Sequence, residues 1–332
     1  MFLGYIHTFR AIAIYFIVAM HCIDAFDWEN SRVLERILRI SISNGTVLLI
    51  FIAGYLFQHL SFRYKYKKYL ITKVRNVITP YLLTSIPAIL LFTLVLKRET
   101  VWEGFYNDPI WLQVIYFYIT GLHLAPFWFI PVITIFYLVS PGLFFAGRSK
   151  FFYYVLPVFV LVSCFVGRGE SSPFISFVHF FSVYSLGMFF SRYKDFLNNW
   201  LCKTSIIFCT ILATLVVWIC EYNYTNTTYT YFNFLQKLVL CIVILGVLIR
   251  LDEKASCYYI YLVADASFGI FFVHSYVLTL GKIVAQKTFS TLPQGSLWAY
   301  LLVTIITLFV CTAFIHSIKA VFGSRSRLLV GS

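Results

Sequence analysis

The sequence predicts an all-α polytopic membrane bundle of about ten transmembrane helices. Of its 332 residues, 61% are hydrophobic and only 12% are charged, whereas a water-soluble domain carries about 25% charged residues. The mean hydropathy is +0.84, and apolar runs recur along the whole chain. A soluble fold is therefore excluded, and the 20% aromatic content excludes disorder.

Apolar runs bounded by charged or turn residues mark the expected membrane spans, which form a single domain over residues 1–332. The spans are predicted at residues 8–26, 44–60, 78–96, 126–145, 151–167, 174–190, 203–220, 232–249, 266–284 and 297–318. Between the third and fourth spans, the aromatic stretch Trp111–Tyr118 indicates a re-entrant or interfacial segment.

The first span is short enough to be the apolar core of a secretory signal peptide, and Arg10 precedes it. No small-residue cleavage site follows. Met20-His21-Cys22 places a large and a basic residue where a lipoprotein signal needs small ones. We therefore expect a retained first helix.

The chain carries a net charge of +13, from 26 Lys and Arg against 13 Asp and Glu. In a soluble protein this excess would suggest nucleic acid, but in a membrane protein it marks cytoplasmic loops that face anionic lipids. With the amino terminus inside, the inner loops hold 16 Lys and Arg and the outer loops hold 8. We expect a multi-pass protein of the cytoplasmic (inner) membrane, with both termini cytoplasmic and no nucleic-acid partner.

The eight cysteines form no CxxC pair, and most of them lie within apolar runs. This distribution is typical of small residues buried in a membrane domain. The sequence therefore predicts no metal site.

Ionisable residues inside a membrane span are costly, and the first span carries several. Arg10 and His21 are 11 residues apart, which places them on one helix face, about 16 Å apart along the axis. Asp24 follows three residues after His21, close enough to touch the imidazole ring. One face thus presents a cation towards one end and an imidazole with a carboxylate towards the other.

This arrangement suits acyl or proton transfer. A neutral imidazole can take a proton from a hydroxyl group at about pH 7, a carboxylate can fix its tautomer, and Arg10 could bind phosphate or polarise a carbonyl group. Alternatively, Arg10 extends to the inner interface and His21 only bonds a neighbouring helix. His179 and His316, isolated in apolar spans, are expected to form hydrogen bonds between helices.

Four further motifs follow in order along the chain. They are Phe51–Phe57, with an expected helix break at Gly54; the basic run Arg63–Lys68 with Lys73 and Arg75 before Pro80-Tyr81; Phe127–Pro131 around Trp128; and Phe268–His274 in the ninth span. Together with Arg10 and His21, they resemble the acyltransferase-3 family, the integral-membrane acyltransferases that modify bacterial surface glycans. The most specific element of the resemblance is Arg10 with ten residues before His21.

Three features depart from the family pattern. The family often has two arginines three residues apart before the Pro-Tyr pair, but this chain has Lys73 and Asn76, with Arg75 between them. The family's proline shortly after the ninth-span histidine is missing, because a serine follows His274. The soluble domain that some members carry at the carboxyl end is not expected here.

The resemblance implies a membrane-bound O-acyltransferase, most often an O-acetyltransferase that uses acetyl-CoA. The acyl group would pass from cytoplasmic acyl-CoA, a substrate rather than a bound cofactor, to a sugar hydroxyl of a cell-surface polysaccharide or its lipid-linked precursor. His21, Arg10 and Asp24 would then be the catalytic residues. Whether His21 acts as a base or as a transient acyl carrier is open.

Two further groups of residues are expected to bind the substrates. The donor group consists of Lys67, Lys68, Lys73, Arg75 and Trp128, because the basic loop 61–77 would face the phosphate groups of CoA. Glu170, in a short outer turn, and His274 are the acceptor-side candidates. Trp128 could instead be an interfacial anchor, and Glu170 a solvated turn residue.

The alternative function is a transporter or flippase, or a polymerase, of a lipid-linked glycan. Buried charge and about ten helices suit a transporter equally well, but that class predicts an internal repeat, which the sequence does not show. A polymerase would rely on larger outer loops that carry arginines, whereas the arginine cluster here is limited to Arg32, Arg36 and Arg39.

Overall fold

The computed structural model describes residues 3–169, 171–225, 230–251 and 257–332. It is 82% helical, and these ranges contain no strand, although one isolated bridge joins Asp27 to Gln294. The prediction of an all-α bundle is confirmed. A helix satisfies its own backbone hydrogen bonds, which is what a bilayer requires of a spanning segment.

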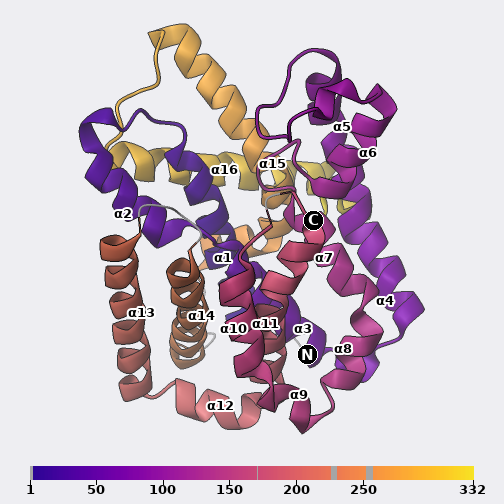
Figure 1. Cartoon of the computed structure of the whole chain (residues 1–332), viewed down its shortest axis with the longest axis vertical. Coiled ribbons are helices and arrows are strands. Elements are labelled where there is room, and N and C mark those ends of the chain that lie inside the picture. The colour runs from indigo at the N-terminus through magenta and orange to yellow at the C-terminus, as the bar shows by residue number, and fades with distance from the viewer. Residues whose placement is uncertain (1–2, 170, 226–229, 252–256) are drawn as a thin grey trace.

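The described residues form helices that Figure 1 colours from indigo to yellow along the chain. The first six are α1 (Gly4–Ile23), α2 (Arg32–Ile42), α3 (Thr46–His59), α4 (Tyr66–Lys73), α5 (Thr79–Leu94) and α6 (Ile110–Thr120). The next six are α7 (Phe129–Leu138), α8 (Ser140–Ala146), α9 (Lys150–Tyr154), α10 (Leu156–Val166), α11 (Pro173–Arg192) and α12 (Lys194–Leu201). The last five are α13 (Thr204–Tyr224), α14 (Tyr231–Leu251), α15 (Tyr258–Phe289), α16 (Leu297–Phe322) and α17 (Ser326–Val330).

Within the described ranges, eight helical segments are long and apolar enough to cross a membrane, and a ninth qualifies if α7 and α8, bent by 61°, form one span. Nine of the ten expected spans therefore have a counterpart. The exception is 151–167, where α10 has only 11 residues. A helix of that length covers about 16 Å, roughly half the hydrocarbon thickness.

Proline explains both the bend between α7 and α8 and the break that makes α10 short. Pro141 lies in the first turn of α8, and Pro157 lies in the first turn of α10. Proline lacks an N–H group and clashes with the preceding turn inside a helix, but it is well tolerated where a helix begins. The chain therefore ends one helix just before each proline and begins another there.

The aromatic stretch Trp111–Tyr118 forms α6, a helix of 11 residues that packs against α5. It is too short to cross a bilayer by itself. Gly121 ends it with a φ of +73°, a left-handed conformation that favours glycine. The chain then turns sharply into the segment 121–128, which becomes part of the site described below.

Helices α3 and α11 approach so closely that glycine is required at two crossing points. A Cβ atom on Gly54 would lie 2.0 Å from the carbonyl oxygen of Tyr184, and one on Gly187 would lie 2.1 Å from that of Phe51. Small residues permit such backbone contact between membrane helices. The helix break expected at Gly54 is wrong, because α3 runs through it to His59 and the glycine serves interhelical packing.

Helix α1 lies inside the bundle, where it contacts α15, α16, α3 and α14. Arg10 donates to the hydroxyl of Ser267 at 2.9 Å, and the rings of His21 and His274 have centroids 5.3 Å apart. Because these two contacts run in the same order along both helices, α1 and α15 are parallel. The face of α1 that carries the ionisable residues is thus turned towards α15.

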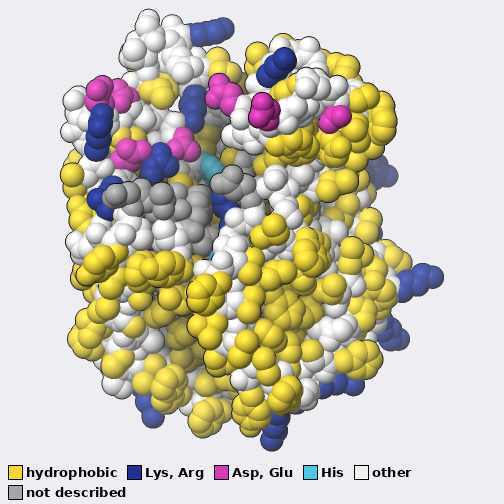
Figure 2. Space-filling model, in the orientation of Figure 1, with side chains coloured by type: hydrophobic (Ala, Val, Ile, Leu, Met, Phe, Trp, Pro, Cys, Tyr) yellow, Lys and Arg dark blue, Asp and Glu magenta, His cyan; other side chains and the backbone are white. Residues whose placement is uncertain are grey.

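Figure 2 shows an apolar surface over the middle and lower part of the drawn face, as lipid chains require. Acidic side chains gather near the upper end, over α2 and the loop after α5, whereas the lower rim shows Lys and Arg alone on this face. We call the end with α2 and segment 95–109 the mouth end, and the opposite end, with α12, the α12 end.

Gly54→Ala and Gly187→Ala should each destabilise the protein, because the added methyl group must push two backbones apart. Overpacking of this kind costs about 1–3 kcal/mol. Gly281→Ala in α15 is the matched control, since a Cβ atom there meets nothing within 4 Å. Thermal unfolding in detergent should give lower midpoints for the first two variants only, and equal midpoints for all three would contradict the close packing of α3 and α11.

Candidate functional site

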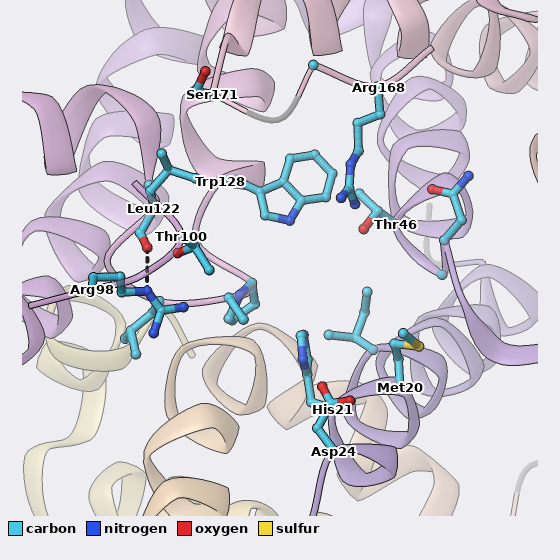
Figure 3. A pocket seen from close by; sticks show the side chains of 18 of the residues that line it. Met20, His21, Asp24, Thr46, Arg98, Thr100, Leu122, Trp128, Arg168 and Ser171 are labelled. Atoms are coloured by element: carbon cyan, nitrogen blue, oxygen red, sulfur yellow. Dashed lines mark hydrogen bonds between the residues drawn. The ribbon is translucent and has the colours of Figure 1, made fainter. Parts of the chain in front are cut away.

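A cavity of about 680 Å³ lies towards the mouth end of the bundle. Its walls are the second half of α1, the junction of α2 and α3, the segments 98–102 and 121–128, and the residues Arg168, Gly169 and Ser171. The volume lies in the range of small-molecule binding sites. Figure 3 shows His21 and Asp24 on one side of this space, with Trp128 and Arg168 opposite them.

His21 and His274 form a pair of imidazoles at the cavity wall. His274 is fully buried, and its Nδ1 lies 2.9 Å from the carbonyl oxygen of Ile270. A carbonyl oxygen only accepts, so Nδ1 carries the proton and Nε2 presents a lone pair. Within the described ranges this Nε2 has no hydrogen-bond partner, and the ring of His21 lies beside it. An N–H group of His21 directed at that lone pair would leave the other His21 nitrogen free as a base.

Arg10 also faces α15 but lies outside the cavity, about three turns from His21. Its guanidinium donates to Ser267 at 2.9 Å. Asp265 attracts it electrostatically, but the Asp265 carboxylate is already paired with Lys319 at 2.7 Å. Arg10 is therefore held in place by a neutral hydroxyl, and among the described residues its charge is only partly compensated.

Four of the residues assigned to the donor lie together on α4 and the π-helical turn Val74–Ile78 that follows it. Lys67, Lys68 and Arg75 are exposed, whereas Lys73 is half-buried. Residues two positions apart point to nearly opposite sides of a helix. Lys73 therefore faces the bundle while Arg75 faces outwards.

The inward side chain of Lys73 packs on aromatic rings. Its ammonium group lies 5.3 Å from the ring centre of Tyr69 and 4.9 Å from that of Tyr137, as in cation–π contacts. It is also close enough to Arg10 for the two positive charges to repel each other. Two inward cations in one neighbourhood suit a ligand that carries phosphate groups.

Asp24 lines the cavity, but its carboxylate is committed to another helix. Its Oδ1 accepts from Arg39 on α2 at 2.8 Å, and Arg39 also donates to Glu35 at 2.9 Å. The ring beside His21 is that of His274. The structure therefore gives the place next to His21, which the sequence assigned to Asp24, to a second histidine.

Trp128 lies with His21 rather than with the basic loop. Its indole ring contacts Phe180, with centroids 5.9 Å apart, and the guanidinium of Arg168 lies 4.7 Å from its centre. The structure thus separates Trp128 from the other four donor residues, none of which lines the cavity. Its aromatic surface holds Arg168 over the cavity (Figure 3).

Sequence reasoning missed several polar residues of the cavity wall, among them Asn44, Arg98 and Arg168. Asn44, at the junction of α2 and α3, has a φ of +59° and is 6% exposed. The Asn-Gly pair at 44–45 is a turn signal that would have found it. Arg98 and Arg168 counted only as outer-loop charges, because nothing in their local pattern separates them from ordinary solvated arginines.

The segment 121–128 is held by a buried histidine. His123 is 0% exposed, and its Nδ1 lies 3.1 Å from the carbonyl oxygen of Phe117. Burial lowers the pKa of His123 to about 3, so the ring is neutral at physiological pH. It packs against the rings of Tyr81 and Phe127 and supports the wall.

A buried polar network fixes the wall that α2 contributes. Lys237 is 0% exposed, and its ammonium donates to the carbonyl oxygens of Ile40 at 3.2 Å and Ser41 at 2.8 Å. A cation is stabilised at a helix C-terminus. Asn233 donates to Ile40 and to the buried carboxylate of Glu221. Sequence reasoning left Lys237 unused, although a lone charge in an apolar span is the signal of such a network.

The other assigned residues have different outcomes. Glu170 lies outside the described residues. His179 contacts the carbonyl oxygen of Ser163 at 2.8 Å and His316 that of Leu262 at 3.3 Å, so both interhelical hydrogen bonds are confirmed. Across the part of the chain that the structure describes, no three His, Cys, Asp or Glu side chains form a group that could hold a metal ion.

Comparison with known proteins gives one match. A family model described as an acyltransferase domain matches residues 3–316. No curated protein and no solved structure matches the chain. The match includes α1, α15 and all of the cavity walls described above.

Proposed function

The chain belongs to the acyltransferase-3 family and is a multi-pass acyltransferase, and on that premise we propose that it acylates a surface glycan. The acyl group, acetyl in the simplest case, comes from cytoplasmic acyl-CoA. The acceptor is a sugar hydroxyl of a cell-surface polysaccharide or its lipid-linked precursor. The family match removes the ground for a transporter or polymerase.

The observation that carries this proposal is the placement of His21. It points from an internal helix into a cavity large enough for a sugar substrate (Figure 3), and a second imidazole of fixed tautomer lies beside it. Transfer to a hydroxyl group needs a base within reach of the reacting proton. His21 meets this requirement, whereas Asp24 is engaged by Arg39.

The reaction that suits this geometry is direct transfer. The acceptor oxygen attacks the thioester carbonyl carbon while the unprotonated nitrogen of His21 takes the hydroxyl proton. The carbon–sulfur bond then breaks, and the proton passes from His21 to the CoA thiolate. His274 presents its Nε2 lone pair beside His21. In the proposed reaction, an N–H group of His21 that turns towards this lone pair orients the ring and stabilises the imidazolium that forms.

The donor binds from the α12 end in this proposal. Lys73 and Arg10 supply inward positive charge, and Lys67, Lys68 and Arg75 supply exposed positive charge around them. Phosphate groups of CoA would meet the exposed residues first, and the acyl-bearing arm would extend along α1 from Arg10 to His21. The 16-to-8 ratio of Lys and Arg supports a cytoplasmic position for this end and for both termini.

Replacement of His21 by Ala should abolish glycan acylation without loss of the protein from the membrane. A positioned general base contributes about 10²–10⁴-fold to rate. Mass spectrometry of the surface glycan should show one acetyl mass per repeat with the wild-type gene and none with the variant. His316→Gln, which changes a histidine outside the site, is the control. Normal acylation by a well-expressed His21→Ala variant would rule out His21 as the base.

His274→Gln tests the pairing of the two rings within the same experiment. The glutamine amide can still accept a hydrogen bond, so activity should fall less than in His274→Ala.

A second experiment tests whether His21 carries the acyl group. Single-turnover incubation with labelled acyl-CoA and no acceptor should leave the protein unlabelled. A stable label on His21 would show an acyl carrier instead of a base.

Arg10→Lys should raise the KM for acyl-CoA by about tenfold or more and change the acceptor KM little, because a charged hydrogen bond contributes about 1.5–3 kcal/mol. Lysine keeps the charge but loses the planar fork of donors. Steady-state kinetics in nanodiscs measure both constants. Arg325→Lys, at an exposed residue outside the site, is the control. A change confined to the acceptor KM would reverse the proposed direction of donor entry.

Reporter fusions test the orientation directly. A reporter after residue 332 should be active only in its cytoplasmic form, and so should one inserted after Lys67. A reporter inserted after Glu103, at the mouth end, should be active only outside the cytoplasm. The opposite pattern would contradict both the topology and the donor side.

A further inference from the structure

Arg98 enters the cavity wall with its position fixed by three contacts. Its Nε donates to the carbonyl oxygen of Leu122 at 3.0 Å, its guanidinium lies 5.1 Å from the ring centre of Phe92, and its backbone N–H donates to the hydroxyl of Tyr106 at 2.6 Å. These contacts engage the Nε atom of Arg98, one face of its planar guanidinium group and its backbone N–H. The terminal nitrogens extend into the space shared with Trp128 and His21 (Figure 3).

Among the residues that the structure describes, no carboxylate forms an ion pair with this half-buried guanidinium. The ion pairs of the described ranges involve Arg39 and Lys319, and none involves Arg98. A cation withdrawn from water without an anionic partner is unfavourable. Arg98 is therefore pre-positioned for an anion that comes from outside the chain, since a guanidinium edge matches a carboxylate or phosphate group.

The other charged side chains of the described cavity wall are compatible with an anionic ligand at Arg98. The Arg168 guanidinium lies over Trp128 and points into the same space (Figure 3). Of the two acidic side chains that line the described cavity, Asp24 is paired with Arg39, which it shares with Glu35. Glu99 is exposed and forms no ion pair with Arg98. Arg98 thus faces this space without an ion pair to either acidic side chain of the described wall.

We propose that Arg98 is the centre of an anion subsite in this cavity, and that the acyl acceptor is an acidic glycan. Its carboxylate or phosphate group pairs with Arg98 while one of its hydroxyl groups reaches His21. This inference deepens the proposed acyl transfer and rests on it. The same guanidinium edge fits an acidic sugar and the phosphate of a lipid-linked precursor, so the experiment includes both chemistries.

The donor is the other anion to consider, because CoA also carries phosphate groups. The inward and exposed cations near Arg10 already provide for it, and Lys73 and Arg10 lie outside the cavity that contains Arg98. One cationic region thus lies around Arg10 and Lys73, and another lies at Arg98 in the cavity, and two separate regions fit two anionic substrates better than one. The kinetics of Arg98 variants towards acyl-CoA decide this point.

Binding can be measured without any acyl donor, by calorimetric titration of the protein in nanodiscs. The three probes are an oligosaccharide containing glucuronic acid, the same oligosaccharide with its carboxyl group reduced to an alcohol, and glucose 1-phosphate. At least one charged probe should bind about tenfold or more tightly than the reduced glycan. Binding should weaken as salt is raised.

Arg98→Gln should remove this preference, and Arg98→Lys should restore it in part. Lys97→Gln is the matched control. It removes the same charge from the neighbouring residue, and Lys97 does not line the cavity. The KM for acetyl-CoA should be unchanged in Arg98→Gln. Preference for the acidic oligosaccharide identifies a carboxylate ligand, and preference for glucose 1-phosphate identifies a phosphate.

Equal affinity for charged and reduced probes, no binding of either charged probe, or an equal loss in Lys97→Gln would overturn the anion subsite. So would a raised KM for acetyl-CoA in Arg98→Gln, since the cation would then serve the donor. Arg98-dependent binding of a charged probe without any acetyl transfer would instead refute the proposed function. Transfer to neutral and acidic glycans at equal rates would refute the acidic acceptor alone.

Discussion

A polar side chain inside a membrane domain must find its partner within the bundle, and the site is organised around this constraint on α1. Arg10 donates to the hydroxyl of Ser267, and the ring of His21 packs against the ring of His274. Both partners lie on α15, so α15 must run parallel to α1 and directly against it. Once this contact is fixed, the remaining free direction for His21 is into the cavity.

The surrounding helices hold this arrangement through contacts of different kinds. The paired glycines Gly54 and Gly187 let α3 and α11 meet at backbone distance and form a rigid side of the bundle. Lys237 anchors the C-terminus of α2, and Arg39 joins α2 to Asp24 at the end of α1. Since α2 leads into Asn44, these polar contacts also determine where the cavity wall lies.

Much of the fold could be predicted from the sequence, because hydrophobicity along a chain directly reports which segments contact lipid. The site was partly predictable for a similar reason: Arg10 and His21 are exceptional inside an apolar run. Tertiary contacts were not predictable. Gly54 has the local signature of a break and serves helix packing instead. Asp24 has the right spacing for His21 but pairs with Arg39. The side chain of Arg98 is held by the carbonyl group of Leu122, 24 residues away, which no local pattern reveals.

The distribution of charge along α1 explains why a histidine pair, and not a carboxylate–histidine pair, suits this position. A carboxylate buried beside His21 would lose several kcal/mol of solvation free energy unless it were fully paired. It would also repel the anionic acceptor that we propose at Arg98. Two neutral imidazoles carry no net charge at rest, so they tolerate burial. In the reaction that we propose, cations at each end would neutralise the phosphate groups of the donor and the acidic group of the acceptor, so that the uncharged hydroxyl and thioester groups meet between them at His21.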